Sequence, residues 1–295
     1  MTLEPPVSYQ GGKTRIADAI ADLLLAEFKP GQDVYDLCCG CGAVSIALVR
    51  KGLDPKRIVM VDSGPWGAFW EMIGAGTFDV DYFRDVVGLL PKDPRDIHAA
   101  LEALSKTDAS RKLSIYMFPL LQAGSFGGKP VSIDGSKWVV HGFRDYWVPT
   151  ETSNRRSHVN PMMPMPETLL GRVVELASAM RGVRGFHKSM ADVAAGGRPL
   201  SYIDPPYLGL TDGYAKDRAA WRESLGSFCR GAIFDVTEFA RELAAKGSPC
   251  LVSESKPLGK EAIKLAGPRA KGGVSGKRAK AHEEWVTWFR PGAST

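Results

Sequence analysis

The chain has 295 residues, a formal net charge of +5 and an apolar content of 44%. This length and composition suit one large domain, or one domain with an insertion, around a substantial core. No apolar run approaches the ~18 residues needed to span a bilayer, and residues 1–6 have neither the basic nor the apolar part of a signal peptide. The modest positive charge permits a polyanionic partner without requiring one.

The five cysteines do not follow the pattern of a disulfide framework, because their number is odd and Cys38, Cys39 and Cys41 crowd into four positions. We therefore expect a reduced, cytoplasmic protein. A zinc site is the alternative, but a structural zinc ion needs four ligands at wider spacing. We expect small thiol side chains that fill a tight loop, and no metal.

The first patterned stretch is residues 9–13, which read YQGGK. Two adjacent glycines let the backbone turn sharply and approach a ligand closely. Apolar residues then recur at helical spacing up to Phe28, and Pro30 and Gly31 end this helix. The stretch is too short for a phosphate-binding loop, so a surface turn is the alternative to a ligand contact.

A strand and a glycine loop come next. An apolar strand is expected at 34–37, the loop at 38–42 reads CCGCG, and a helix follows from about 44 to 49. Glycines let the backbone pass close under a ligand, and the helix N-terminus adds oriented N–H groups. No third glycine follows at the dinucleotide spacing, which favours a ligand without a pyrophosphate. A second strand at 58–62 ends on Asp62, where an acidic residue commonly holds ribose hydroxyls; a helix cap is the alternative.

The pattern changes after a helix expected from residue 63 to about 76. Residues 77–105 look helical with breaks, and residues 113–165 interleave aromatic and basic side chains in loops. That mixture suits phosphate contact and base stacking. The alternative for Trp138, Phe143 and Trp147 is that they form the core of a small insertion. The candidates for nucleic-acid contact in this region are Lys129, Arg144, Arg155 and Arg156.

An amphipathic helix is predicted at 167–180, and a buried strand at 200–203 ends in the sequence DPPY at 204–207. Two successive prolines cannot extend a sheet ladder, and the residue before a proline is held extended. Asp204 therefore lies at a stiff strand end, with Tyr207 three residues on. Open α/β sheets bind ligands outside the carboxyl ends of their strands. The alternative is a turn with a packing tyrosine.

The last third of the chain is expected to hold a helix at about 236–246, a strand at 249–253 and a closing strand at 284–289. Between these strands, residues 267–282 are basic, rich in glycine and free of acidic residues. This composition predicts a mobile basic loop that contacts phosphates through Lys277 and Arg278, with a solvated surface loop as the alternative.

Together, the YQGGK stretch, the glycine loop with Asp62, and DPPY resemble the Dam-like (D12 class) N6-adenine-specific DNA methyltransferases. The match is weak between residues 77 and 165. The resemblance implies an α/β fold with a Rossmann-like S-adenosylmethionine-dependent methyltransferase sheet and an inserted, mainly helical recognition region. It divides the chain into a discontinuous catalytic domain, 1–76 and 166–295, and a target-recognition insert, 77–165.

The resemblance also implies a set of site residues. The cofactor contacts would be Tyr9, Gly12, Lys13, Asp36, Gly40, Gly42, Asp62 and Asp204. The catalytic residues would be Asp204, Pro205, Pro206 and Tyr207. The implied partner is double-stranded DNA with an adenine-containing site, and neither a membrane nor a metal is involved.

The expected activity is transfer of a methyl group from S-adenosyl-L-methionine to the N6 amino group of a flipped adenine in DNA. Asp204 and the Pro205 carbonyl would accept the two N6 hydrogens, and Tyr207 would stack on the base. The alternatives are another amino group, such as cytosine N4 or adenine in RNA, and a DNA-binding protein without turnover. Aspartate at position 204 favours adenine, and the joint presence of the motifs favours turnover.

Overall fold

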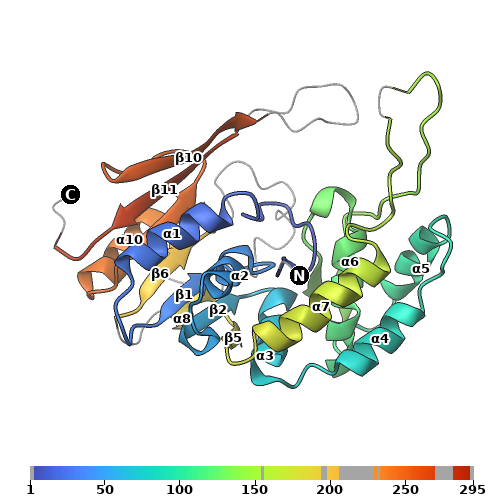
Figure 1. Ribbon diagram of the computed structural model, residues 1–295, viewed down its shortest axis with the longest axis horizontal. Helices are drawn as coiled ribbons and strands as arrows, with labels where there is room; N and C mark the ends of the chain where they lie inside the picture. The colour runs from blue at the N-terminus through green and yellow to red at the C-terminus, as the bar shows by residue number, and fades with distance from the viewer. Residues whose placement is uncertain are drawn as a thin grey trace.

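The computed structural model describes residues 3–153, 156–193, 198–205, 229–230, 233–269 and 282–292. Its centre is a seven-stranded sheet with helices packed around it (Figure 1). From one edge to the other, the strands are β10 (Ala262–Arg269), β11 (His282–Phe289), β9 (Cys250–Glu254), β6 (Leu200–Ile203), β1 (Val34–Leu37), β2 (Ile58–Asp62) and β5 (Arg184–His187).

Most of this sheet is parallel. The strands from β5 through β2, β1 and β6 to β9 pair in parallel, and β11 is antiparallel to both β9 and β10. The α/β class predicted from the sequence is therefore confirmed, and the mostly parallel sheet is compatible with a Rossmann-like fold. A separate two-stranded ladder joins β7 (Cys229–Arg230) to β8 (Ile233–Phe234).

The strand order reverses at β1. The chain moves from β1 outward through β2 to β5, then returns to place β6 on the other side of β1. Connections on the two sides of such a point diverge to opposite faces and leave a crevice at the carboxyl ends of the strands. The carboxyl ends of β1 and β6 are thus the place where this topology favours a ligand.

The central strands are apolar because both of their faces are covered. Along β2, Ile58 and Met60 belong to one core cluster, and Val59 and Val61 belong to the other. This alternation follows from the two-residue period of a strand. The helices of the first face are α1 (Ala17–Glu27), α2 (Ala43–Arg50) and α3 (Pro65–Ala75), and α10 (Val236–Ala245) and α8 (Met190–Val193) lie on the second. A short 3-10 turn, η1 (Pro55–Arg57), precedes β2.

The described residues of 77–165 form a body beside the sheet, called here the helical body because helices are most of its regular structure (Figure 1). Its elements are α4 (Val80–Gly88), α5 (Ile97–Leu104), η2 (Lys112–Tyr116), α6 (Phe118–Gly124), η3 (Phe126–Gly128), β3 (Ser132–Asp134) and β4 (Lys137–Val139). The helix α7 (Pro166–Ala179) packs against α4 and α6 of this body and against α3 beside the sheet. One hydrophobic core runs through both parts, including Trp66, Phe118 and Leu169.

The aromatic residues of this body divide into two groups. Trp138 and Phe143 are buried, and Trp138 stacks on Phe118 with ring centroids 6.5 Å apart. For these two residues, the expectation that they are core residues is confirmed, although this core is continuous with that of the sheet. Trp147 is instead 38% exposed. It pairs with Val159 in an antiparallel bridge within an extended hairpin that projects from the body (Figure 1).

Candidate active site

Three stretches that the sequence singled out meet at the carboxyl edge of the sheet. Leu37, the last residue of β1, pairs with Val61 on one side and with Ile203 on the other. The glycine loop, Asp62 and Asp204 therefore lie side by side at this edge. Two backbone hydrogen bonds fix their register: Asp204 N donates to Leu37 O at 3.2 Å, and Cys39 N donates to Val61 O at 3.0 Å.

The glycine loop at 38–42 is held tightly from two sides. The Trp70 Nε1 atom donates to Gly40 O at 2.9 Å. Gly42 has φ +75°, and a Cβ there would lie 2.5 Å from the Trp70 ring. A Cβ on Gly40 would lie 3.1 Å from the Tyr9 ring. Only glycine meets both the backbone angle and the close approach at position 42, so the sequence signal has a direct structural reason.

Asp62 joins the end of β2 to the glycine loop. Its Oδ2 atom accepts a hydrogen bond from Gly40 N at 2.9 Å, and its Oδ1 atom accepts one from Gly64 N at 2.8 Å. Burial raises the pKa of this carboxyl, and the two backbone hydrogen bonds oppose that rise. A carboxylate offers about four lone-pair sites, so both oxygens retain acceptor capacity for a ligand hydroxyl.

Asp36 lies beneath the loop and is only 2% exposed. Its Oδ2 atom accepts a hydrogen bond from the Ser45 hydroxyl at 2.6 Å, which ties β1 to α2. Burial raises the pKa of Asp36 to about 7 against the lowering effect of the Ser45 hydrogen bond, and Asp204 and Asp62 add to the rise. The side chain thus supports the loop from below, a role that the sequence did not indicate.

This shift makes folding stability depend on pH at Asp36. Its ionised form is disfavoured in the fold, so stability is fully present below the ordinary pKa of 3.8 and falls as pH rises toward about 7. Asp36→Asn removes the charge and keeps an acceptor for Ser45. The unfolding free energy of this variant minus that of the wild type should therefore be roughly 3 kcal/mol larger at pH 8 than at pH 4.5. Urea denaturation at both pH values measures it, with the exposed Asp54→Asn as control; an equal effect at both pH values contradicts the account.

Asp204 forms a buried ion pair with Lys13. The Lys13 Nζ atom lies 2.7 Å from Oδ1 and 2.8 Å from Oδ2 of Asp204, and it also donates to Gly11 O at 2.8 Å. The side chains are 4% and 16% exposed, respectively. Burial raises the pKa of Asp204 to about 6, and Lys13 opposes that rise. The pair joins the first and last of the motifs across 191 positions.

Two further carboxylates at this edge escaped the sequence prediction. Glu254 ends β9 and is 2% exposed, and Glu284 lies in β11; both raise the pKa of Asp204. The Glu254 Oε1 atom accepts hydrogen bonds from the backbone and the hydroxyl of Ser255, at 2.6 and 2.8 Å. The sequence could have indicated Glu254, because this residue directly follows the apolar strand predicted at 249–253, as Asp204 follows the strand predicted at 200–203.

The remaining predicted cofactor and catalytic residues are placed as follows. A Cβ on Gly12 would lie 3.0 Å from Tyr9 O and 3.6 Å from Cys41 Sγ, so the YQGGK turn packs on the glycine loop. Pro205 is buried directly after Asp204. Pro206 and Tyr207 lie outside the described residues, so their predicted roles stay predictions.

Among the basic residues predicted to contact nucleic acid, Lys129 directly follows a residue that is bonded to the YQGGK turn. The preceding residue, Gly128, accepts a hydrogen bond from Gln10 N at 2.8 Å. Arg144 is half-buried, its Nη1 atom donates to Ala123 O at 3.4 Å, and burial lowers its pKa. Arg156 is exposed on the projecting hairpin. Arg155, Lys277 and Arg278 are outside the part of the chain that the structure describes.

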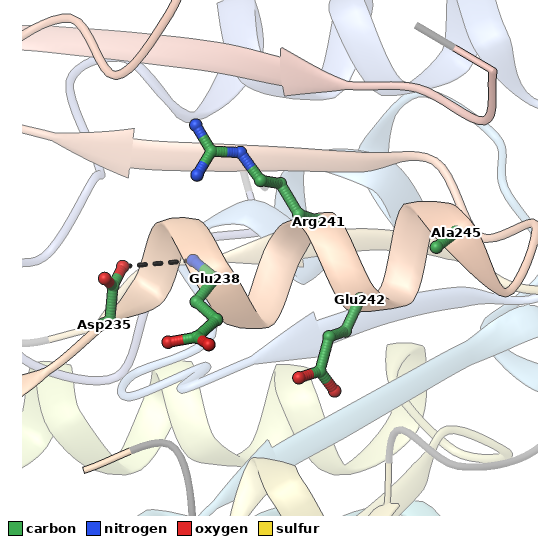
Figure 2. A pocket seen from close by; sticks show the side chains of 5 residues that line it. All are labelled: Asp235, Glu238, Arg241, Glu242 and Ala245. Atoms are coloured by element: carbon green, nitrogen blue, oxygen red, sulfur yellow. Dashed lines mark hydrogen bonds between the residues drawn. The ribbon is translucent and has the colours of Figure 1, made fainter. Parts of the chain in front are cut away.

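A hollow on α10 is separate from the residues at the carboxyl edge of the sheet. Figure 2 shows that its lining comes from one helix and its cap: Asp235, Glu238, Arg241, Glu242 and Ala245. The Asp235 carboxylate accepts a hydrogen bond from Glu238 N at 3.0 Å, which is an ordinary N-cap. No second element converges on the hollow among these lining residues, so it offers no chemistry of its own.

Within the described ranges, no group of three or more His, Cys, Asp or Glu residues is arranged to hold a metal ion. Burial raises the pKa of Cys41 to about 12, which keeps this thiol protonated. The same residues contain no helix with the length and apolarity that crossing a membrane requires. A scan of the chain against protein-family models finds no match, and a search of curated proteins also finds none.

Proposed function

We propose that the chain is an S-adenosylmethionine-dependent methyltransferase that acts on the N6 amino group of adenine in DNA. The observation that carries this proposal is the convergence of separate stretches on one sheet edge. The glycine loop, Asp62 and Asp204 follow three adjacent strands, and Lys13 reaches Asp204 from the YQGGK turn. Packing alone does not require these residue types together at a topological switch point.

The residues at the edge fit the proposed cofactor. Asp62 keeps acceptor capacity for ribose hydroxyls, and the Tyr9 ring packs close to Gly40, whose N–H donates to Asp62. Asp204 and Glu254 supply negative charge for a cationic sulfonium group. When bound, S-adenosylmethionine would supply the activated methyl group, and Asp62, Gly40 and Tyr9 would hold it.

The chemical role of Asp204 follows from its position. The amino nitrogen of adenine is a poor nucleophile, because its lone pair is delocalised into the ring. A fixed acceptor at the N6 hydrogens favours the localised lone pair that forms in the transition state. Asp204 is stiffly held and partly exposed at the rim. The Pro205 carbonyl is the proposed second acceptor, and Tyr207 the proposed stacking residue.

DNA is the proposed partner, and residues 77–165 are the proposed recognition region. The exposed Trp147 and Arg156 lie on the projecting hairpin, and Lys129 lies beside the YQGGK turn. Exposed aromatic and basic side chains suit base stacking and phosphate contact. Lys277 and Arg278 remain proposed phosphate contacts from the basic loop.

Asp62→Ala should weaken S-adenosylmethionine binding about tenfold or more, since it removes acceptors for the ligand and the anchor of Gly40. Asp62→Asn keeps one acceptor oxygen and should lose less affinity. Isothermal titration calorimetry measures both, with circular dichroism to confirm folding. The exposed Asp54→Ala is the matched control and should bind normally. Unchanged affinity in folded Asp62→Ala would remove Asp62 from the cofactor site.

The proposed function is tested by sequencing modified bases in DNA from cells that express the protein. We expect N6-methyladenine at a defined sequence with the wild type and none with Asp204→Ala at equal expression. Methylation at cytosine N4, or no modification with a folded wild type, overturns the assignment to adenine in DNA.

A further inference from the structure

Lys13 is buried in a way that its predicted role as a cofactor contact does not explain. Its side chain is 4% exposed, and its ammonium group lies within 2.8 Å of both Asp204 oxygens and of Gly11 O. Taking an ammonium group out of water is unfavourable unless good partners compensate the lost hydration. The contacts show that the charge of Lys13 interacts mainly with the Asp204 carboxylate.

The turn that carries Lys13 is itself fixed on both sides. Within the N-terminal segment, Gly12 N donates to Tyr9 O at 3.0 Å, and Ile16 N donates to Lys13 O at 2.8 Å where α1 begins. On the side of the insert, Gln10 N donates to Gly128 O at 2.8 Å, and Ser8 N donates to Met163 O at 3.2 Å. Figure 1 shows this N-terminal segment between the sheet and the helical body. Lys13 is thus preorganised rather than free to follow a ligand.

We propose that Lys13 is a positioning residue, which holds the Asp204 carboxylate by both oxygens and leaves acceptor capacity on each for a substrate amino group. The ion pair is observed whatever the protein's function is, but the identity of the substrate amino group rests on the proposed function. The Lys13 ammonium group occupies about one lone-pair site on each Asp204 oxygen, and a carboxylate has about four lone-pair sites. The N6 hydrogens could therefore bind to an oriented carboxylate while the Lys13–Asp204 ion pair stays intact.

The positive charge of Lys13 also opposes the effect of neighbouring carboxylates on the pKa of Asp204. Glu254 of β9 and Glu284 of β11 both raise the pKa of Asp204, and Asp36 of β1 and the Tyr202 hydroxyl of β6 interact with its charge. Lys13 lowers that pKa through its charge and its hydrogen bonds. Without Lys13, Asp204 would be protonated over a wider pH range and would lose acceptor capacity.

The test compares Lys13→Met, which removes the charge at similar length, with Lys13→Arg, which keeps it. The first readout is the carboxyl ¹³C resonance of Asp204, assigned by its loss in Asp204→Asn and followed through a pH titration. We expect the pKa of Asp204 to rise by about one unit or more in Lys13→Met and to stay near the wild-type value in Lys13→Arg. Lys51→Met breaks a surface pair with Asp22, at 2.7 Å, and should leave Asp204 unchanged.

The second readout separates positioning from cofactor binding. Lys13→Met should retain S-adenosylmethionine affinity within about threefold by calorimetry, while its single-turnover methyl transfer falls about tenfold or more, with the acid limb of the pH profile moved upward. Lys13→Gln, which also removes the charge, serves the same comparison if Lys13→Met does not fold. Lost cofactor affinity with an unmoved Asp204 titration in the charge-removing variant overturns the proposal.

The two proposals fail in different ways. If the wild type transfers no methyl group to DNA but the Asp204 titration shifts in Lys13→Met, the proposed function is wrong and the positioning of Asp204 holds. If the wild type methylates DNA and Lys13→Met matches it in rate and in the Asp204 titration, the positioning role is wrong and the function holds.

Discussion

Replacing Asp204 by alanine should slow the methyl-transfer step at least about a hundredfold and leave the fold intact. The change deletes one preorganised acceptor at the substrate amino group, and a deletion of that size removes several kcal/mol of transition-state stabilisation. The fold should survive because Asp204 lies at the rim, 16% exposed, and its backbone hydrogen bond to Leu37 does not depend on the side chain.

Single-turnover transfer of labelled methyl groups to DNA measures this effect. Asp204→Asn keeps the shape and one acceptor oxygen, so it should lose less than Asp204→Ala. Asp33→Ala is the control, because Asp33 precedes β1 at the opposite edge of the sheet and pairs with Arg184 at 2.8 Å. Near-normal transfer by folded Asp204→Ala would remove Asp204 from the chemistry.

The same residue predicts a pH dependence. The pKa of Asp204 is raised to about 6 by burial, against the lowering influence of Lys13. Its carboxylate form, the better acceptor, is therefore lost as pH falls through about 6. The acid limb of the wild-type profile should lie in that region and should disappear from the residual activity of Asp204→Ala.

Replacing Gly42 by alanine should destabilise the protein by roughly 3 kcal/mol or more and abolish cofactor binding. A side chain at φ +75° is strained by about 1–2 kcal/mol. The added Cβ would also lie 2.5 Å from the Trp70 ring and 2.8 Å from the Met60 methyl group. Both partners are fully buried, so neither can move without opening the core.

Gly52→Ala is the matched control for this prediction. Gly52 has φ +93°, and nothing lies within 4 Å of a Cβ built there. It should therefore show backbone strain without a clash and retain cofactor affinity. Urea denaturation compares the two variants, and equal losses of unfolding free energy would contradict the tight packing of the loop on Trp70.

Local sequence signals predicted the strand ends well. The glycine loop and DPPY each follow a short apolar strand, and Asp62 ends one. Glycine permits backbone angles that other residues avoid and proline restricts them, so both residue types mark strand ends in the sequence. Parallel strands bring their carboxyl ends to one edge, so the juxtaposition of these stretches could be anticipated once an α/β sheet was expected. The observed register between Leu37, Val61 and Ile203 meets that expectation.

The partners of these residues could not be predicted in the same way. Lys13 and Asp204 are 191 positions apart, and no local pattern records their contact. The Asp36–Ser45 and Asp62–Gly40 hydrogen bonds likewise depend on how loop and helix fold back over the strand ends. A side-chain partner chosen by tertiary packing leaves no periodic signal in the sequence.

The burial of aromatic residues in the helical body could not be predicted from the sequence either. Trp138 and Trp147 both lie in a stretch rich in aromatic and basic residues, yet Trp138 is 8% and Trp147 is 38% exposed. Composition could not separate them, because the difference arises from the packing of Trp138 on Phe118 and the position of Trp147 on the hairpin. Exposure makes Trp147 the better candidate for contact with a partner.

The most direct test of the central claim is single-turnover transfer from S-adenosylmethionine with a labelled methyl group, followed by digestion of the substrate to nucleosides. Duplex DNA, RNA and protein are offered in parallel at equal concentration, with Asp204→Ala as the inactive comparison. The account predicts label on N6-methyl-2′-deoxyadenosine derived from DNA with the wild type and at least about a hundredfold less with the variant. Label on RNA, on protein or on cytosine, with none on adenine in DNA, would contradict it.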